Sequence, residues 1–117
     1  MAYPPVHIMN STHYGAAGTV VYPSALCSND RYTVYPEQEW TASGRGYCLV
    51  TEINAKLGLG DGVTYWATPY KSSGTSYSQF AIIQTKENPP EFSVTRVITA
   101  GDEPPADYVE PTENQNF

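Results

Sequence analysis

Helical periodicity is almost absent from this chain of 117 residues, and that absence constrains its fold more than any other feature. Short runs of β-branched and aromatic residues recur instead, separated by proline, glycine, serine and asparagine. The one stretch with helical spacing covers residues 53–59, where Gly58 and Gly60 would stop a helix. We therefore expect strands at residues 6–9, 19–22, 32–35, 40–42, 47–54, 63–67, 79–85 and 92–98.

Alternating side chains and turn residues organise these strands into one predicted domain. Along residues 47–54 one face carries Tyr47, Leu49, Thr51 and Ile53, and the other carries Cys48, Val50 and Glu52. Within residues 58–62, the Asp61-Gly62 pair tolerates the positive φ of a tight hairpin turn. About eight short strands at this spacing predict a single-domain antiparallel β-sandwich, jelly-roll-like, formed by residues 1–100.

The composition changes after Ala100, and residues 101–117 form an acidic, proline-rich tail. Five of the 12 acidic residues lie there with no Lys or Arg, so the preceding body holds 7 acidic and 6 basic residues. Such a segment cannot bury enough apolar surface to fold by itself. We expect it either to keep the protein in solution or to dock on a neighbouring subunit through its apolar residues, Tyr108, Val109 and Phe117.

Charge and hydropathy exclude several classes of partner. A chain of net charge −6 with few arginines is a poor candidate for binding nucleic acid through its phosphates. No segment approaches the roughly 20 apolar residues that a membrane-spanning helix needs. The N-terminus shows neither the basic region nor the apolar core of a signal peptide, so we expect the chain to be intracellular, already processed or exported by a non-classical route.

The two cysteines, Cys27 and Cys48, allow two interpretations. A disulfide between them would close a loop of moderate length and stabilise the fold by about 3 kcal/mol. Two buried free thiols would be equally ordinary for cysteine. A metal site is not expected, because these cysteines with His7 and His13 lack ligand spacing, and no cofactor is implied.

Catalytic motifs are missing, so we expect no enzymatic activity. The Gly58–Gly62 segment is followed by a strand rather than by the helix that a dinucleotide loop requires. No serine stands in a nucleophile elbow. Glu37 and Glu39 are close in sequence but are typical of a solvated turn before Trp40, rather than of a glycosidase pair.

Two isolated features have structural explanations that we prefer to functional ones. The Asn10-Ser-Thr12 triplet fits the N-glycosylation pattern, but that pattern is short and occurs by chance. Arg45, between Gly44 and Gly46, could bind an anionic group, yet we expect it to form a structural salt bridge.

Tyrosine is the signature of the composition, with 10 Tyr beside 2 Trp and 3 Phe. Its ring packs in cores and also contacts partners at surfaces. Residues 65–77 place three tyrosines and a tryptophan around Ser, Gly and Thr, and we interpret them as a contact loop. The alternative is that Tyr65 or Trp66 belongs to the core and that the loop is merely flexible. The predicted ligand-binding residues are Trp66, Tyr70, Ser72, Ser73, Thr75 and Tyr77.

Three parts of the sequence resemble the small β-sandwich cytolysins, such as the aegerolysins and actinoporins. These parts are the opening Val6-His-Ile-Met-Asn-Ser-Thr12, the central Trp40-Thr-Ala-Ser-Gly-Arg-Gly-Tyr-Cys48 and the aromatic stretch 65–77. The resemblance implies a lectin-like or toxin-like protein that recognises membrane lipids through surface aromatics, with a partner or by oligomerising. The chain has no amphipathic N-terminal helix of the actinoporin kind, which argues against autonomous pore formation.

The sequence therefore leads to two functional expectations. The first is a non-enzymatic protein that recognises a cell-surface glycan or lipid headgroup through the Tyr/Trp-rich stretch, with Trp66, Tyr70 and Tyr77 as the platform. The second is a structural subunit that assembles into an oligomer, filament or shell, its proline-rich termini docking on neighbouring subunits.

Overall fold

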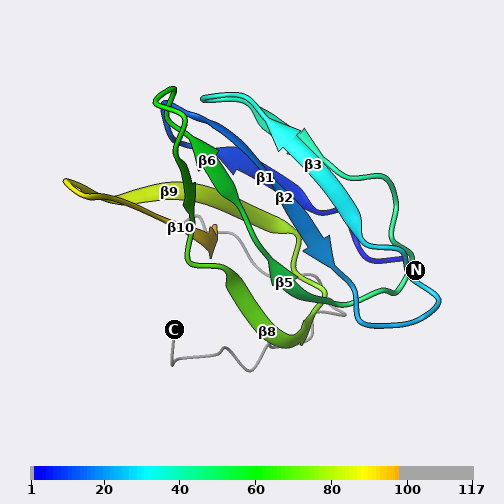
Figure 1. Cartoon of the computed structure of the whole chain (residues 1–117). Coiled ribbons are helices and arrows are strands. Elements are labelled where there is room, and N and C mark those ends of the chain that lie inside the picture. The colour runs from blue at the N-terminus through cyan, green and yellow to red at the C-terminus, as the bar shows by residue number, and fades with distance from the viewer. Residues whose placement is uncertain (1, 98–117) are drawn as a thin grey trace.

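A computed structural model describes residues 2–97, which form ten β-strands in two stacked sheets. Figure 1 shows the paired β2 and β3 as neighbouring arrows, while β9 and β10 of the other sheet extend as a long hairpin. The strands are β1 (His7–Asn10), β2 (Gly15–Val21), β3 (Asp30–Val34), β4 (Glu39–Thr41), β5 (Val50–Ile53), β6 (Lys56–Gly58), β7 (Thr64–Trp66), β8 (Tyr70–Thr75), β9 (Gln79–Glu87) and β10 (Pro90–Arg96).

The two sheets differ in size and in connectivity. The four-stranded sheet has the order β10-β9-β1-β4, and β1 runs parallel to β9 within it. The six-stranded sheet has the order β7-β6-β2-β5-β8, and β3 pairs with the other edge of β2. The all-β sandwich predicted from the sequence is thereby confirmed, although one strand pair is parallel rather than antiparallel. The tail residues 101–117, with Tyr108, Val109 and Phe117, lie outside the described residues.

Two strands were missed by the sequence analysis. Residues 53–59, the one stretch with helical spacing, contain β6, which pairs with both β2 and β7. Residues 70–75, interpreted as a loop, form β8, which pairs with β5. Local propensity is weak in both segments, and cross-strand pairing decides their structure.

The alternation predicted for residues 47–54 is wrong in register. Only Val50–Ile53 forms a strand, and a β-bulge interrupts its pairing with β8 between Val50 and Glu52. A bulge places two residues opposite one, so the side-chain period of two is broken there. Val50 and Ile53 are consequently both buried, although the simple alternation placed them on opposite faces.

The core lies between the sheets and is contributed by almost every strand. Its largest fully buried apolar side chains are Phe80, Ile8, Ile53, Leu57, Ile82, Val6, Val20 and Val50. Several tyrosines complete it, since Tyr70 and Tyr77 both pack on Phe80, with ring centroids 4.9 and 6.1 Å away. Much of the aromatic content is therefore structural.

A glycine marks the place where β2 changes partners from β6 to β5. A Cβ on Gly18 would lie 2.0 Å from the backbone oxygen of Asn54, so no other residue fits without movement. Asn54 is close enough to β2 for its side-chain oxygen to accept a hydrogen bond from the Thr19 amide at 2.9 Å. β2 therefore changes its partner strand beside Asn54, and the backbone amide of Thr19 keeps a hydrogen bond there.

Glycines form the turn between β6 and β7, and backbone hydrogen bonds cover one edge of the sandwich. Gly60 and Gly62 have φ of 83° and 79°, as expected for the hairpin that joins β6 to β7. Thr68 exchanges backbone hydrogen bonds with Phe92 and Val94, which covers the free edge of β10. Among residues 2–97, no helix has the length and apolar character needed to cross a membrane.

Candidate functional site

The predicted aromatic platform is not a surface. Tyr70 and Tyr77 have only 5% and 8% of their surface exposed, and the Tyr77 hydroxyl donates to the backbone oxygen of Val97. Both rings face the core because β8 and the turn after it cover Phe80. Trp66 is the exception, with 67% of its surface exposed. Tyr70 and Tyr77 therefore belong to the core and do not form the expected surface platform, while the ligand contact assigned to Trp66 remains a prediction.

The hydroxyl residues predicted to bind the ligand, Ser72, Ser73 and Thr75, also differ in their exposure. Thr75 is fully buried, and its hydroxyl accepts a hydrogen bond from the Tyr77 amide at 3.0 Å. Ser72 donates to the backbone oxygen of Val50 at 2.9 Å, which supports the β5–β8 pairing. Ser73 is exposed, but it lies on β8, whereas Trp66 lies on β7 at the other end of the sheet order. The structure therefore brings none of these groups together with Trp66.

Trp66 instead borders a shallow groove on the outer face of the six-stranded sheet. This outer-face groove encloses about 240 Å³ and is lined by Gly15, Ala16, Ala17, Thr33, Tyr35, Lys56, Leu57, Gly58 and Thr64. The pairing registers place one row of residues directly across four strands, in the order Thr33, Ala17, Lys56 and Trp66. A second row contains Gly15, Gly58 and Thr64. Tyr35, the residue directly after the end of β3, lies beside this row.

Two exposed aromatic side chains thus stand on opposite sides of a low floor. Tyr35 has 71% of its surface exposed and follows β3, while Trp66 belongs to β7. Three strand spacings separate β3 from β7, so the two rings are anchored about 14 Å apart across the sheet. The floor between them is low because Gly15 and Gly58 have no side chain and open space above them.

Polar side chains complete the groove. Thr33 and Thr64 are exposed at its two sides, and Lys56 is exposed beside Trp66. A hydroxyl can donate and accept, and an ammonium group offers three donors. The groove therefore combines flat apolar surface with adaptable hydrogen-bonding groups, a combination typical of binding sites.

This groove could have been found in part from the sequence. Glycine weakens a strand interior and often marks the close approach of a ligand or another backbone. The segment Gly15-Ala-Ala-Gly18 carries two such glycines inside one strand: Gly18 lies against the backbone of Asn54, and Gly15 has open space above it in the groove. Tyr35 carried no comparable signal, because its position depends on where β3 pairs.

Two larger cavities are weaker candidates. A cleft of about 530 Å³ lies between residues 68–71 and the strands β9 and β10, but its one aromatic, Tyr70, is buried. A cavity of about 290 Å³ lies beside the disulfide, with Arg45 in its lining. We favour the smaller groove because it alone, among the three, has an exposed aromatic side chain in its lining.

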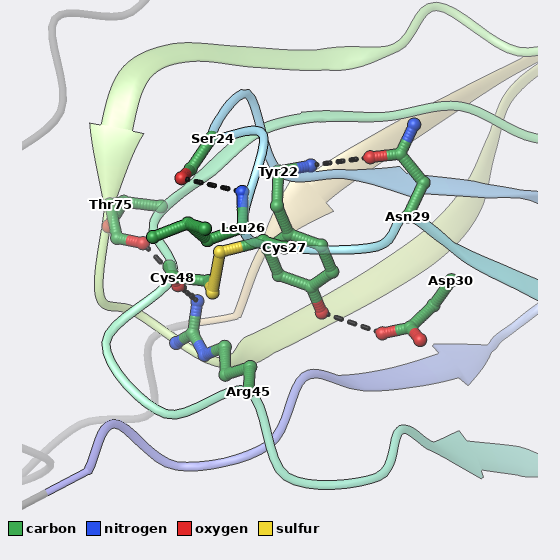
Figure 2. The surroundings of a disulfide bond; sticks show 9 residues. All are labelled: Tyr22, Ser24, Leu26, Cys27, Asn29, Asp30, Arg45, Cys48 and Thr75. Atoms are coloured by element: carbon green, nitrogen blue, oxygen red, sulfur yellow. Dashed lines mark hydrogen bonds between the residues drawn. A yellow bond between two sulfur atoms is a disulfide. The ribbon is translucent and has the colours of Figure 1, made fainter.

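Figure 2 shows the residues around the disulfide, several of which line this cavity. Cys27 and Cys48 are bonded to each other, which selects the disulfide from the two interpretations. The bond closes a loop with a sequence separation of 21, so on the chain-entropy model it stabilises the fold by about 3 kcal/mol. Leu26, beside it, is almost fully exposed, but single exposed apolar side chains are common.

Arg45 is held by backbone oxygens rather than by a carboxylate. Its Nε donates to Pro4 at 2.8 Å, and Nη1 donates to Cys48 and Thr75, both at 3.3 Å. Nη2 donates to Ser76 and, at 3.1 Å, to Tyr77. All five N–H groups are therefore used, which leaves none for a ligand. The predicted salt bridge is wrong, because no described carboxylate lies within ion-pair distance of Arg45.

Burial perturbs the titration of this region. It lowers the pKa of Arg45, since the charged guanidinium is removed from water, while the neighbouring Tyr22 and Tyr3 act in the opposite direction. It also raises the pKa of Tyr22, and the hydrogen bond from the Tyr22 hydroxyl to Asp30 at 2.8 Å adds to that rise. These shifts have structural causes and do not require a functional site.

Asn10 is also structural, as preferred from the sequence. It is fully buried, and its Nδ2 donates to the backbone oxygens of Tyr14 and Val34. Its Oδ1 accepts hydrogen bonds from the amide and hydroxyl of Thr12. The side chain that a glycan would modify is thus enclosed and already bonded. Among residues 2–97, no three His, Cys, Asp or Glu side chains gather as metal ligands would.

Comparison with known proteins gives no relative on which to base an identity. No protein-family model, curated protein or solved structure matches the chain. The resemblance to the β-sandwich cytolysins therefore stays a resemblance.

Proposed function

We propose that this protein is a non-enzymatic binding protein that recognises a glycan through the outer-face groove. The observation that carries the proposal is the position of two exposed aromatic rings, Trp66 and Tyr35, on opposite sides of the groove. The floor between them consists of Gly15, Ala17 and Gly58. Both aromatic side chains stay in water at a cost, and they flank a concave apolar surface rather than standing alone.

The groove suits a sugar chain for reasons of shape and chemistry. A sugar ring has an apolar C–H face, which packs on an aromatic ring, and a rim of hydroxyl groups, which needs hydrogen-bond partners. Trp66 and Tyr35 supply the aromatic faces, and Thr33, Lys56 and Thr64 supply the partners. A floor about 14 Å wide would admit an extended oligosaccharide rather than one small molecule.

The proposed function is binding without catalysis. No Asp, Glu, His or Cys is among the described residues that line the groove. A lipid headgroup remains the competing ligand, because interfacial tryptophan and tyrosine also settle at membranes. We favour the glycan because the groove is bordered at both sides, whereas membrane contact buries an apolar face in the headgroup layer.

Binding to an array of neutral oligosaccharides tests the proposal, with vesicles of neutral and anionic phospholipids as the second arm. Trp66→Ala and Tyr35→Ala should each lower affinity for the oligosaccharides at least tenfold, because each removes one stacking surface. Gly15→Thr should also abolish binding, since its new side chain would fill open space on the floor. The melting temperature should stay nearly unchanged in all three variants.

Two variants are matched controls. Tyr47→Ala removes another exposed tyrosine, next to Cys48 and outside the groove lining. Gly44→Thr adds a side chain at another glycine with open space around it. Both should bind as the wild type does. Binding to vesicles that depends on Trp66, with no oligosaccharide bound, would replace the glycan by a lipid; binding that survives all three groove variants would exclude this groove.

A further inference from the structure

The charges on the six-stranded sheet are unlike those of the whole chain. The protein has a net charge of −6, yet the strands of this sheet carry three basic residues and two acidic ones. Both acidic residues already have a partner within the protein: Asp30 accepts the hydrogen bond from Tyr22, and Glu52 lies 4.0 Å from Lys71. The remaining two basic residues, Arg31 and Lys56, are exposed and form no ion pair with any described residue.

Both of these cations belong to the outer-face groove or its border. Lys56 lies in the row of residues between Ala17 and Trp66, so its ammonium group stands beside the aromatic face. Arg31 precedes Thr33 by two residues on β3 and therefore projects from the same outer face, about 7 Å further along the strand. The groove thus has one cation inside it and a second at its edge.

We propose, on the basis of the glycan-binding function above, that the ligand is an anionic glycan whose sugars carry carboxylate groups. An exposed lysine is a compact, strongly hydrated charge that an incoming carboxylate can approach directly. An ion pair formed beside Trp66 would be partly shielded from water by the ring and the sugar, and would exceed an ordinary surface pair in strength.

The described part of the chain is close to neutral, which is compatible with an anionic ligand. Five of the 12 lie in residues 101–117, and residues 2–97 hold 7 acidic against 6 basic side chains. Charges more than about 8 Å apart are largely screened at physiological salt, so a charged side chain in contact with the ligand counts for more than the net charge of the chain. In the groove lining the only charged side chain is that of Lys56, which is positive.

Two matched pairs of probes test the inference by isothermal titration calorimetry: oligogalacturonate against its methyl ester, and sialyllactose against its methyl ester. Each pair keeps the sugar framework and changes the carboxylate. We expect the wild type to bind at least one acidic member about fivefold to tenfold more tightly than its neutral partner. That ratio should shrink as salt is raised from about 50 to 500 mM, because an exposed ion pair is screened.

Lys56→Gln should reduce the ratio towards one, and Arg31→Gln should reduce it by about twofold. Lys86→Gln is the control, since it removes the same charge from the other sheet, where Lys86 pairs with Glu91 at 3.8 Å. It should leave the ratio unchanged.

The outcomes separate this inference from the function on which it rests. Equal affinity for the acidic and neutral members, with both lost in Trp66→Ala, would overturn the carboxylate preference and leave glycan binding intact. An equal drop in the ratio for Lys86→Gln would show that overall charge, and not Lys56, sets the preference, and would also overturn the inference. Failure of every acidic and neutral sugar to bind would remove both proposals together.

Discussion

The disulfide end of the sandwich and the outer-face groove use the same residue types for opposite purposes. At the disulfide end, Arg45 donates all five of its N–H groups to backbone oxygens, and Tyr77 and Thr75 are buried around it. In the groove, Lys56 and Tyr35 are exposed, and the glycines beneath them leave open space. Cation, aromatic ring and hydroxyl therefore occur in both regions, but Arg45, Tyr77 and Thr75 are buried, whereas Lys56, Tyr35 and Thr33 face solvent.

The difference shows that residue type alone does not identify a binding site. What distinguishes the two regions is whether the polar groups and ring faces are already satisfied by the protein. A buried polar group without a partner is costly, so the fold satisfies such groups internally at the disulfide end. The exposed side chains of the groove have no such requirement, and a ligand can supply their partners.

Tyrosine substitutions should give the largest contrast between the two regions. Tyr77→Ala should lower the free energy of unfolding by about 3–5 kcal/mol, because it removes a ring packed against Phe80 and the hydrogen bond to Val97. Trp66→Ala, which deletes an even larger ring, should change it by less than about 0.5 kcal/mol, since that ring is exposed. Urea unfolding measures both.

If Trp66→Ala proves as destabilising as Tyr77→Ala, the ring belongs to the packed structure and the groove loses one of its two walls. Tyr35→Ala is then the variant that decides whether the remaining side can bind. A small effect of Tyr77→Ala would instead mean that the two regions are not different in kind.

An arginine substitution should give the next largest contrast. Arg45→Met keeps much of the apolar stem but leaves five backbone oxygens without their donor, and we expect a loss of about 2–4 kcal/mol in the free energy of unfolding. Arg31→Met, the same change at an exposed site, should cost less than about 0.5 kcal/mol. Chemical unfolding at two salt concentrations checks the assignment, because backbone hydrogen bonds should respond to salt less than a surface ion pair. Equal losses in the two variants would contradict it.

The sequence predicted the fold class well because turn residues and β-branched runs act locally. The Asp61-Gly62 turn and most strand positions follow from nearest neighbours. Where pairing between distant strands decides the outcome, the prediction fails. The short strand β6 and the bulge in β5 depend on β2 and β8, which are not adjacent to them in the sequence.

The candidate site was predicted less well for the same reason. Trp66, Tyr70 and Tyr77 are close in sequence, yet β8 turns Tyr70 into the core and leaves Trp66 outside it. The residues that accompany Trp66 are Lys56, Ala17 and Thr33, which come from three other strands. Only the register of those strands brings them together, and a single sequence contains little information on register.

Alkaline titration should give the smallest effect, and it separates the buried tyrosines from the exposed ones. Burial raises the pKa of Tyr32, and burial together with the hydrogen bond to Asp30 raises the pKa of Tyr22. In the unfolded chain these hydroxyls ionise near the usual value of about 10. As the pH rises through that value, the unfolded state loses protons that the folded state keeps, so the free energy of unfolding should fall. Their contribution is thus complete below about pH 10 and declines above it.

Tyr22→Phe should reduce the steepness of this decline, although loss of the hydrogen bond to Asp30 should itself cost about 1 kcal/mol near neutral pH. Tyr47→Phe removes a hydroxyl from an exposed ring and serves as the control. Urea unfolding between about pH 8 and pH 11 measures the slope in each protein. A wild-type slope of zero across that range would show that the tyrosines of the interior ionise as easily as those of the unfolded chain. The interior would then be wet, and the contrast between a closed disulfide end and an open groove would not hold.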